Sequence, residues 1–284
     1  MPPRSNPTAR QVRLGSELRK LREASGMLAK EAGTLLGGGS AQISHIEAGR
    51  WGVSPDRVRH MAKLYSCGDA ALVQALSTMA DDHRSKHWWH AYRGILAPGF
   101  LDISELEHHA TYIKCLQPVT FPGVLQTEEY ARALFGSVIP RLPDEELDAR
   151  VEHRLRRRVI LEQESPPPFE AIIHEAALRM RAGSRKTARE QLEHLTEVAG
   201  WPCVTLRVIP FAQEDFIEVT QTLMYAGAVV PQLDTVHCDT PFGGRYLDTA
   251  ADLDKYQALL DGARRASLSP EESRVFIHRI AQEL

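Results

Sequence analysis

Residues 26–50 read GMLAKEAGTLLGGGSAQISHIEAGR, and this stretch decides the fold of the amino-terminal part of the chain. Its pattern predicts a short helix, a turn of three glycines and a second short helix. Ile43 and Ile46 are three residues apart, so they can share the buried face of the second helix. Ser44 and His45 then project from its other side. The stretch therefore predicts a helix that is anchored by two isoleucines and presents short polar side chains.

Three further helices are expected around this pair. The first spans residues 9–24, where leucines recur at i, i+4 and i+7. Another begins near Pro55, and the last spans residues 70–79. Ser40 is expected to cap the polar helix, and Gly49 to end it in the left-handed conformation that favours glycine. Five short helices in about eighty residues predict a compact all-α domain.

The length and composition indicate a globular protein with two domains. The chain has 284 residues, of which 43% are hydrophobic and 25% are charged. No apolar run approaches the ~18 residues of a membrane span, and the first residues lack the apolar core of a signal peptide. We therefore expect no membrane association. The cysteines are far apart and predict reduced thiols in a cytoplasmic protein: Cys67, Cys115, Cys203 and Cys238.

The net charge of −3 is unevenly distributed along the chain. Residues 1–65 hold 11 Lys and Arg against 5 Asp and Glu, a balance of +6. The whole chain holds 34 against 37, so the remainder holds 23 against 32, a balance of −9. A basic amino-terminal module on an acidic body is typical of a DNA-binding head attached to a part that does not bind DNA.

The amino-terminal module resembles the Xre/Cro-repressor family of helix-turn-helix domains, and its spacing over residues 26–50 matches that family without a gap. The matching residues differ in type and agree at fixed offsets: Gly37, Ile43, Ser44, Ile46, Glu47 and Gly49. The chain departs from the family at Leu28 and Ala29, where relatives have a Ser or Thr cap followed by Gln. Because that Gln commonly contacts the DNA backbone, one phosphate contact is expected to be missing. His45 stands where many relatives have Arg.

The resemblance implies which side chains meet DNA. Candidates to face base edges or phosphates are Ser40, Ala41, Gln42, Ser44 and His45. An amide such as that of Gln42 can pair with adenine, and an imidazole such as that of His45 can donate to guanine; a solvated His45 is the alternative. Arg50 is expected to bind phosphate, with Arg57 or Arg59 as further candidates. Arg22 and Glu47 occupy positions that form a buried ion pair in relatives.

The segment DDHRSKHWWHAYRG (residues 81–94) leads into the second part of the chain. A continuous helix would place His83, His87 and His90 on one face. That spacing is compatible with a metal, but no matched cysteine or carboxylate completes a site, so we expect no metal. A polar helix face beside buried Trp88 and Trp89 is the simpler interpretation.

The second part is predicted to be α+β. Helices are expected over residues 103–115, 144–164, 175–181, 184–199, 253–266 and 270–284. FEAIIH, CVTLRVIP, QTLMYAG and VVPQLDTVHC are predicted as strands, and PFGGRY as a hairpin turn. Together with the segment FPGVLQTEEY and the Trp pair, these stretches resemble the actinobacterial Xre regulators of the WhiJ kind. The expected fold is mainly α, with a five-helix Xre/Cro-like domain (residues 1–82) joined to a larger α+β regulatory or partner-binding domain (residues 83–284).

No catalytic constellation is predicted. HEAAL lacks the second His of a zinc-protease helix, and neither a Gly-x-Ser-x-Gly elbow nor a phosphate-binding glycine loop is present. Glu175 after His174 has the residue types of an acid–base pair, but an acidic residue at a strand-to-helix junction is structurally ordinary. We therefore expect no enzyme activity and no cofactor.

The sequence thus predicts a sequence-specific transcriptional regulator that binds double-stranded operator DNA as a homodimer, controlled through its carboxy-terminal domain. The resemblance suggests that its partner is a small protein encoded nearby. One alternative is an antitoxin-like module that binds such a partner and autoregulates its own operon. Another is a small-molecule sensor with a pocket lined by Trp88, Trp89, Tyr92 and Phe100, although a plain hydrophobic core also explains these aromatics.

Overall fold

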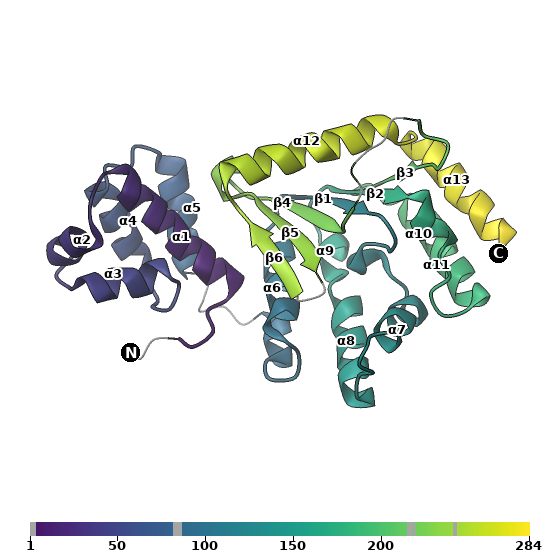
Figure 1. The fold of residues 1–284 in the computed structure, drawn as a ribbon, viewed down its shortest axis with the longest axis horizontal. Helices are drawn as coiled ribbons and strands as arrows, with labels where there is room; N and C mark the ends of the chain where they lie inside the picture. The colour runs from purple at the N-terminus through teal and green to yellow at the C-terminus, as the bar shows by residue number, and fades with distance from the viewer. Residues whose placement is uncertain (1–3, 82–86, 215–217, 219, 241–242) are drawn as a thin grey trace. The chain divides into compact units, whose positions relative to one another are not determined.

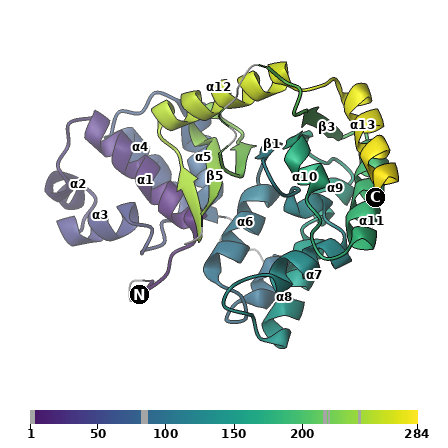
Figure 2. The same ribbon diagram turned by 45° about the vertical axis from the view of Figure 1, so that its right-hand side comes forward.

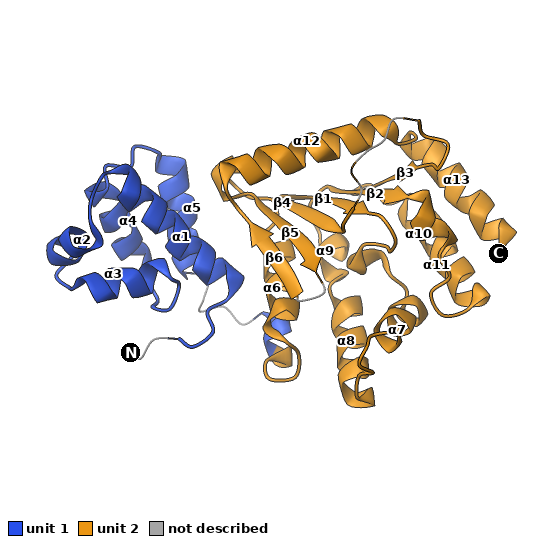
Figure 3. Cartoon of the chain, viewed as in Figure 1, with its two compact units in different colours: residues 1–90 blue, residues 91–284 orange. Residues whose placement is uncertain are grey.

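The computed structural model describes residues 4–81, 87–214, 218, 220–240 and 243–284 (Figure 1). The chain divides into two compact units, Met1–His90 and Ala91–Leu284 (Figure 3). The predicted domain boundary between residues 82 and 83 lies outside the described residues. The fold class is confirmed, because a helical amino-terminal unit precedes an α+β unit built on a six-stranded mixed sheet.

Short helices form the first unit, and each begins where the sequence supplies a start signal. They are α1 (Ala9–Ala24), α2 (Ala29–Leu35), α3 (Ser40–Glu47), α4 (Pro55–Leu64) and α5 (Ala70–Asp81), followed by the 3-10 helix η2 (Trp88–Tyr92). The Thr8 hydroxyl accepts the amide hydrogen of Gln11 to cap α1, and the Ser54 hydroxyl caps α4 ahead of Pro55. Leu18, Ile43, Val58 and Met61 are completely buried in the core of this unit.

Two expectations for the first unit are wrong. Ser40 is the first residue of α3 and not its cap, because Gly39 occupies the N-cap position with an extended backbone. The helical period of residues 28–36 predicts Ala32, Leu35 and Leu36 in the core, but Leu35 is 59% exposed and Leu36 half-buried, whereas Ala32 and Gly33 are buried. The short α2 thus buries its small residues, which allows a close approach of its neighbours.

The second unit contains a sheet with the strand order β3-β2-β1-β4-β5-β6. The strands are β1 (Tyr112–Gln117), β2 (Phe169–His174), β3 (Val204–Ile209), β4 (Leu223–Gly227), β5 (Thr235–Thr240) and β6 (Gly243–Leu247). β1, β2 and β3 are parallel, and β4, β5 and β6 continue the sheet in antiparallel pairs. The parallel half requires crossover connections, which the helices between the strands supply.

Helices cover both faces of this sheet. On one face α12 (Ala250–Ala266) packs Leu260 and Ala263 against Leu116 and Ile172 of the strands (Figures 1 and 2). The larger core lies on the other face. Its helices are α6 (Pro98–His108), η3 (Gly123–Leu125), α7 (Glu128–Gly136), α9 (Val159–Glu162), α10 (Glu175–Arg179), α11 (Arg185–Val198) and α13 (Pro270–Glu283). The helix α8 (Asp144–Arg156) contacts α7 and η3, and the 3-10 turn η4 (Pro231–Leu233) precedes β5.

Three predictions for the second unit need correction. The helix expected over residues 103–115 ends at His108, and its last third is β1, whose alternating residues face the two cores. The helix expected over residues 144–164 is interrupted after Arg156, where Arg157 turns its guanidinium to Glu107. Residues 243–246, expected in a hairpin turn, belong to β6, and residues 241–242 lie outside the described part.

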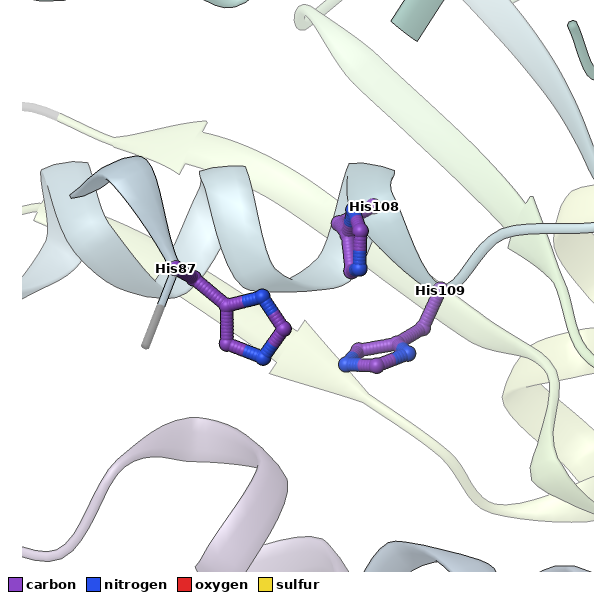
Figure 4. Close-up of side chains that lie close together, drawn as sticks. All are labelled: His87, His108 and His109. Carbon is purple, nitrogen blue, oxygen red and sulfur yellow. The ribbon is translucent and has the colours of Figure 1, made fainter. Parts of the chain in front are cut away.

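The histidines near the junction do not follow the predicted pattern. His83 lies outside the described residues, and Trp88–Tyr92 form a 3-10 helix instead of continuing an α-helix. The ring of His87 stacks on Trp89 with 4.4 Å between centroids. Two other histidines, His108 and His109, lie at the carboxyl end of α6 with their rings edge to face (Figure 4). Within the described ranges, no helix combines the length and apolar character of a membrane span.

Candidate nucleic-acid interface

α3 is held in the first unit by its apolar face and by close backbone contacts at its carboxyl end. Ile43 is 0% and Ile46 is 3% exposed, as their spacing predicts. A Cβ atom at Gly15 of α1 would lie only 2.5 Å from the carbonyl oxygen of Glu47. Gly49 has φ +70°, and a Cβ atom there would lie 2.8 Å from the carbonyl oxygen of Gln11. Glycines on both sides therefore let α3 and α1 meet backbone to backbone.

The turn before α3 also depends on glycine. A Cβ atom at Gly33 would lie 2.6 Å from the carbonyl carbon of Gly39, so α2 and the start of α3 approach closely. Gly37 has φ +70°, a conformation that side chains other than glycine rarely adopt. At Gly38 a Cβ atom would lie 1.8 Å from Gln42 Oε1. The amide of Gln42 therefore folds over the turn in this conformation.

An ion pair joins the end of α3 to the end of α1. Arg22 donates to both carboxylate oxygens of Glu47, with Nε to Oε1 at 2.6 Å and Nη2 to Oε2 at 3.0 Å. The side chains are only 10% and 7% exposed, and Arg22 Nη1 also donates to the Met27 carbonyl at 2.8 Å. The hydrogen bond with Glu47 raises the pKa of Arg22 against the opposing effect of burial. This two-point pairing fixes the orientation of α3.

The predicted contact residues occupy the accessible side of α3 and the loop after it. Ser40, Ala41, Ser44 and Arg50 are exposed, whereas Gln42 and His45 are half-buried. The Ser44 hydroxyl donates to the Ser40 carbonyl at 3.1 Å, so it is engaged within the helix. Ser40, Ala41 and Ser44 therefore form the exposed side of α3, and Arg50 lies exposed in the loop that follows it.

His45 is stacked on Trp51, which the sequence analysis did not single out. Their ring centroids are 5.3 Å apart and the planes meet at 23°. The backbone carbonyl of His45 accepts the amide hydrogens of both Arg50 and Trp51, at 2.9 and 3.1 Å. His45 is thus neither fully solvated nor independent: its ring is oriented by the loop. The sequence signal for this contact is the position of Trp51, an aromatic residue that directly follows Gly49 and Arg50 at the end of α3.

The amino-terminal arm contributes a second basic residue. The three prolines in residues 1–8 predict an unstructured tail, yet the amide of Arg4 donates to the carbonyl of Arg50 at 2.9 Å. The Arg4 guanidinium lies close to Gly52, since a Cβ atom there would be 3.2 Å from Nη2. Arg4 and Arg50 therefore lie on adjoining backbone segments beside the end of α3. The capping box of Thr8 with Gln11 directs the arm to this place.

Glu175, weighed above as an acid–base residue, is engaged in the fold. It is 6% exposed, and its carboxylate accepts hydrogen bonds from Arg179 Nε at 2.6 Å and from the Phe211 amide at 2.7 Å. His174 Nδ1 accepts the amide hydrogen of Ala176 at 3.2 Å, which caps α10. Both side chains hold the junction between β2 and α10 together.

Comparison with known families gives two matches that follow the two units. A helix-turn-helix domain model matches residues 13–76, and the model of a domain of unknown function (DUF5753) matches residues 100–279. Neither curated proteins nor solved structures give a match to the chain. Helix-turn-helix domains indicate DNA binding and are typically not enzymes, so the first match points to a DNA-binding regulator.

Proposed function

The chain belongs to the DUF5753 family, and from this premise and the geometry of α3 we propose that it is a sequence-specific transcriptional regulator that binds operator DNA as a homodimer. The observation that carries the proposal is the mounting of α3. Its apolar side is buried, its carboxyl end is fixed by the Arg22–Glu47 pair, and its opposite side is accessible. A rigid helix with a short-chain polar face is what entry into a major groove requires.

Within this proposal the residues divide into two roles. Gln42 and His45 read base edges, with Gln42 unfolding from the turn to reach adenine and His45 presented by Trp51. Ser40, Ala41 and Ser44 allow close approach and contribute little discrimination. Arg50 binds phosphate, which positions the helix without reading sequence, and Arg4 joins it there. Few strong base contacts are thus available to one head, which favours pairing of two heads on successive half-sites.

The division into a DNA-binding domain (residues 1–82) and a regulatory domain (residues 83–284) belongs to the same proposal. The resemblance to Xre regulators of the WhiJ kind supports a second role for the α+β domain, in dimerisation or in binding a small protein encoded nearby. Sedimentation of the full chain with and without a palindromic site tests dimerisation. Copurification with the product of a neighbouring small gene tests binding of a small protein.

The test of the proposed function is sequencing of DNA fragments selected by the purified full chain. A regulator of this kind enriches a motif with two half-sites related by a twofold axis and centred about one helical turn apart. Recovery of fragments without any common motif would contradict sequence-specific binding.

The reading residues are tested by the double variant Gln42→Ala/His45→Ala. Preference for the selected site should fall to that for random DNA, while a weaker, salt-sensitive affinity remains. The matched control is Gln74→Ala/His60→Ala, which removes the same side-chain types from exposed positions on α5 and α4. If the first variant kept its preference, another element would have to be the reader.

A further inference from the structure

The α+β unit contains a cavity of about 650 Å³ on the sheet face opposite α12. This volume lies within the range typical of small-molecule sites. Apolar side chains form much of its wall: Phe100, Ile103, Phe121, Leu134, Phe169 and Met224. They come from α6, the segment after β1, α7, β2 and β4, so every wall belongs to one compact unit.

Arg154 on α8 places a guanidinium in this wall, and its contacts are with neutral groups. Its Nη1 donates to Gln126 Oε1 at 2.7 Å, and its guanidinium carbon lies 4.4 Å from the centre of the Phe135 ring. Among the described residues no carboxylate forms an ion pair with it. Gln126 is itself buried and uses its Nε2 to donate to the Phe121 carbonyl, so its oxygen is directed to Arg154.

Arg157, one turn further along, is neutralised. Its Nε and Nη2 donate to the two carboxylate oxygens of Glu107 at 2.9 and 2.5 Å, and both side chains are buried. Gly123 makes room for both arginines, since a Cβ atom there would lie 2.8 Å from Arg157 Nη1 and 3.0 Å from Arg154 Cδ. The charged residues of the wall are thus the Arg157–Glu107 ion pair, the cation of Arg154, and the carboxylates of Asp102 and Asp239.

Burial and, to a smaller extent, the charge of Arg157 lower the pKa of Arg154 to about 9. Because an arginine stays protonated at neutral pH, the lowered pKa expresses a free-energy cost of keeping this cation in the wall. An anion beside Arg154 would offset that cost. The acidic residue Asp239 also lines the cavity, but its side chain is 66% exposed and lies beside His237, with 3.9 Å from Oδ1 to Nε2.

Tyr246, which also lines the cavity, carries a second polar group. The Tyr246 hydroxyl is buried and has no hydrogen-bond partner among the residues that the structure describes. A buried hydroxyl without a partner is unfavourable, so a movement of the Tyr246 ring that let the hydroxyl donate to a bound acceptor would be favoured. Nearby, Gln117 accepts a hydrogen bond from the Thr120 hydroxyl at 3.2 Å, and both residues line the cavity.

We propose that this cavity binds a small organic anion that carries a carboxylate on an apolar, ring-sized body. Arg154 pairs with the carboxylate, Tyr246 donates to it or to a neighbouring acceptor, and the apolar wall receives the body. The assignment goes beyond DNA binding and does not depend on it. It also revises the expected sensor pocket, because Phe100 lines the cavity whereas Trp88, Trp89 and Tyr92 are not among its lining residues.

The experiment titrates the full chain by calorimetry with 2-naphthoate and with its neutral analogue 2-naphthamide. The naphthoate is expected to bind more tightly by about tenfold or more, which corresponds to at least about 1.4 kcal/mol. Arg154→Met should abolish this difference, because it keeps an apolar stem and removes the charge. Tyr246→Phe should weaken naphthoate binding less. The folding of each variant is checked by its thermal unfolding.

The matched control is Arg150→Met on the same helix. Arg150 also lies over Phe135, at 5.9 Å, and over the wall residue Phe100, at 4.9 Å, but it pairs with Glu146 and does not itself line the cavity. It should bind naphthoate as the unmodified chain does. Equal affinity for the acid and the amide would overturn the proposal, as would naphthoate binding that survives Arg154→Met. Absence of naphthoate binding at millimolar concentration would also overturn it, and so would equally tight binding of inorganic phosphate, since the apolar body would then be irrelevant.

Discussion

Two arginines, the buried Arg22 in the helical unit and the half-buried Arg154 in the α+β unit, differ in what they are paired with. Arg22 in the helical unit meets both oxygens of Glu47, a carboxylate from the helix that it positions. Arg154 in the α+β unit meets the neutral amide of Gln126 and the face of Phe135. A guanidinium with a carboxylate partner holds two helices in place, whereas one without such a partner is prepared for an anion from outside. The difference separates a structural arginine from a binding arginine.

The largest loss of stability is expected from breaking the ion pair between Arg22 and Glu47. Glu47→Ala leaves the Arg22 cation buried without its carboxylate and should destabilise the helical unit by about 3–5 kcal/mol. Hydrogen exchange of the amides of α1 and α3 measures the loss within that unit. The double variant Arg22→Met/Glu47→Leu removes both charges and should recover most of the stability. If the double variant were as unstable as the single one, the ion pair would not account for the loss.

The next largest loss of stability is expected from disturbing the close packing of α3 against α1, which does not depend on the ion pair. Gly15→Ala places a methyl group 2.5 Å from the Glu47 carbonyl oxygen, so the backbones of α1 and α3 must separate. We expect a loss of about 1–3 kcal/mol and a parallel loss of operator affinity. Gly68→Ala is the control, because a Cβ atom at Gly68 would meet nothing within 4 Å. Equal melting temperatures for the two variants would show that α1 and α3 tolerate a wider spacing.

Much of the helical unit follows from the sequence, because its information is local. Periodic leucines, Ser54 with Pro55, and the helix-ending Gly49 each determine an element through neighbours in the chain. The same reasoning misplaced β1, since Ile113 also fits the helical period of the residues before it. Only pairing with β2 and β4, which are distant in sequence, makes that segment a strand.

The candidate sites show the same limit. The accessible face of α3 was predictable from spacing, whereas the stacking of His45 on Trp51 required the path of the following loop. Arg154 stands in the run RLRRRV, which reads as a solvated basic face. Nothing in that run tells which arginine meets Glu107 and which meets Gln126, because both partners lie on other elements.

Replacing two neighbouring arginines of the α+β unit is expected to change the stability of the protein in opposite directions. Arg154→Met should stabilise the protein by about 1–2 kcal/mol, because it removes a half-buried cation that has no carboxylate partner. Arg157→Met should have the opposite sign, since it leaves Glu107 charged and 2% exposed. Denaturant unfolding of the two variants under identical conditions measures both. Destabilisation by both would mean that the contacts of Arg154 with Gln126 and Phe135 outweigh its desolvation.

The smallest effect concerns an arginine that is exposed in the free protein. Arg50 follows α3 and lies beside Arg4, so its proposed role is to displace counterions from a phosphate. Arg50→Ala should weaken binding to all DNA sequences alike and reduce the slope of log affinity against log salt by about 0.9 per subunit. Protein stability should not change, in contrast to the buried arginines. Arg279→Ala, which removes an exposed arginine from α13, controls for net charge alone. An unchanged slope in Arg50→Ala would remove this residue from the phosphate contacts and leave Arg4 to be tested in its place.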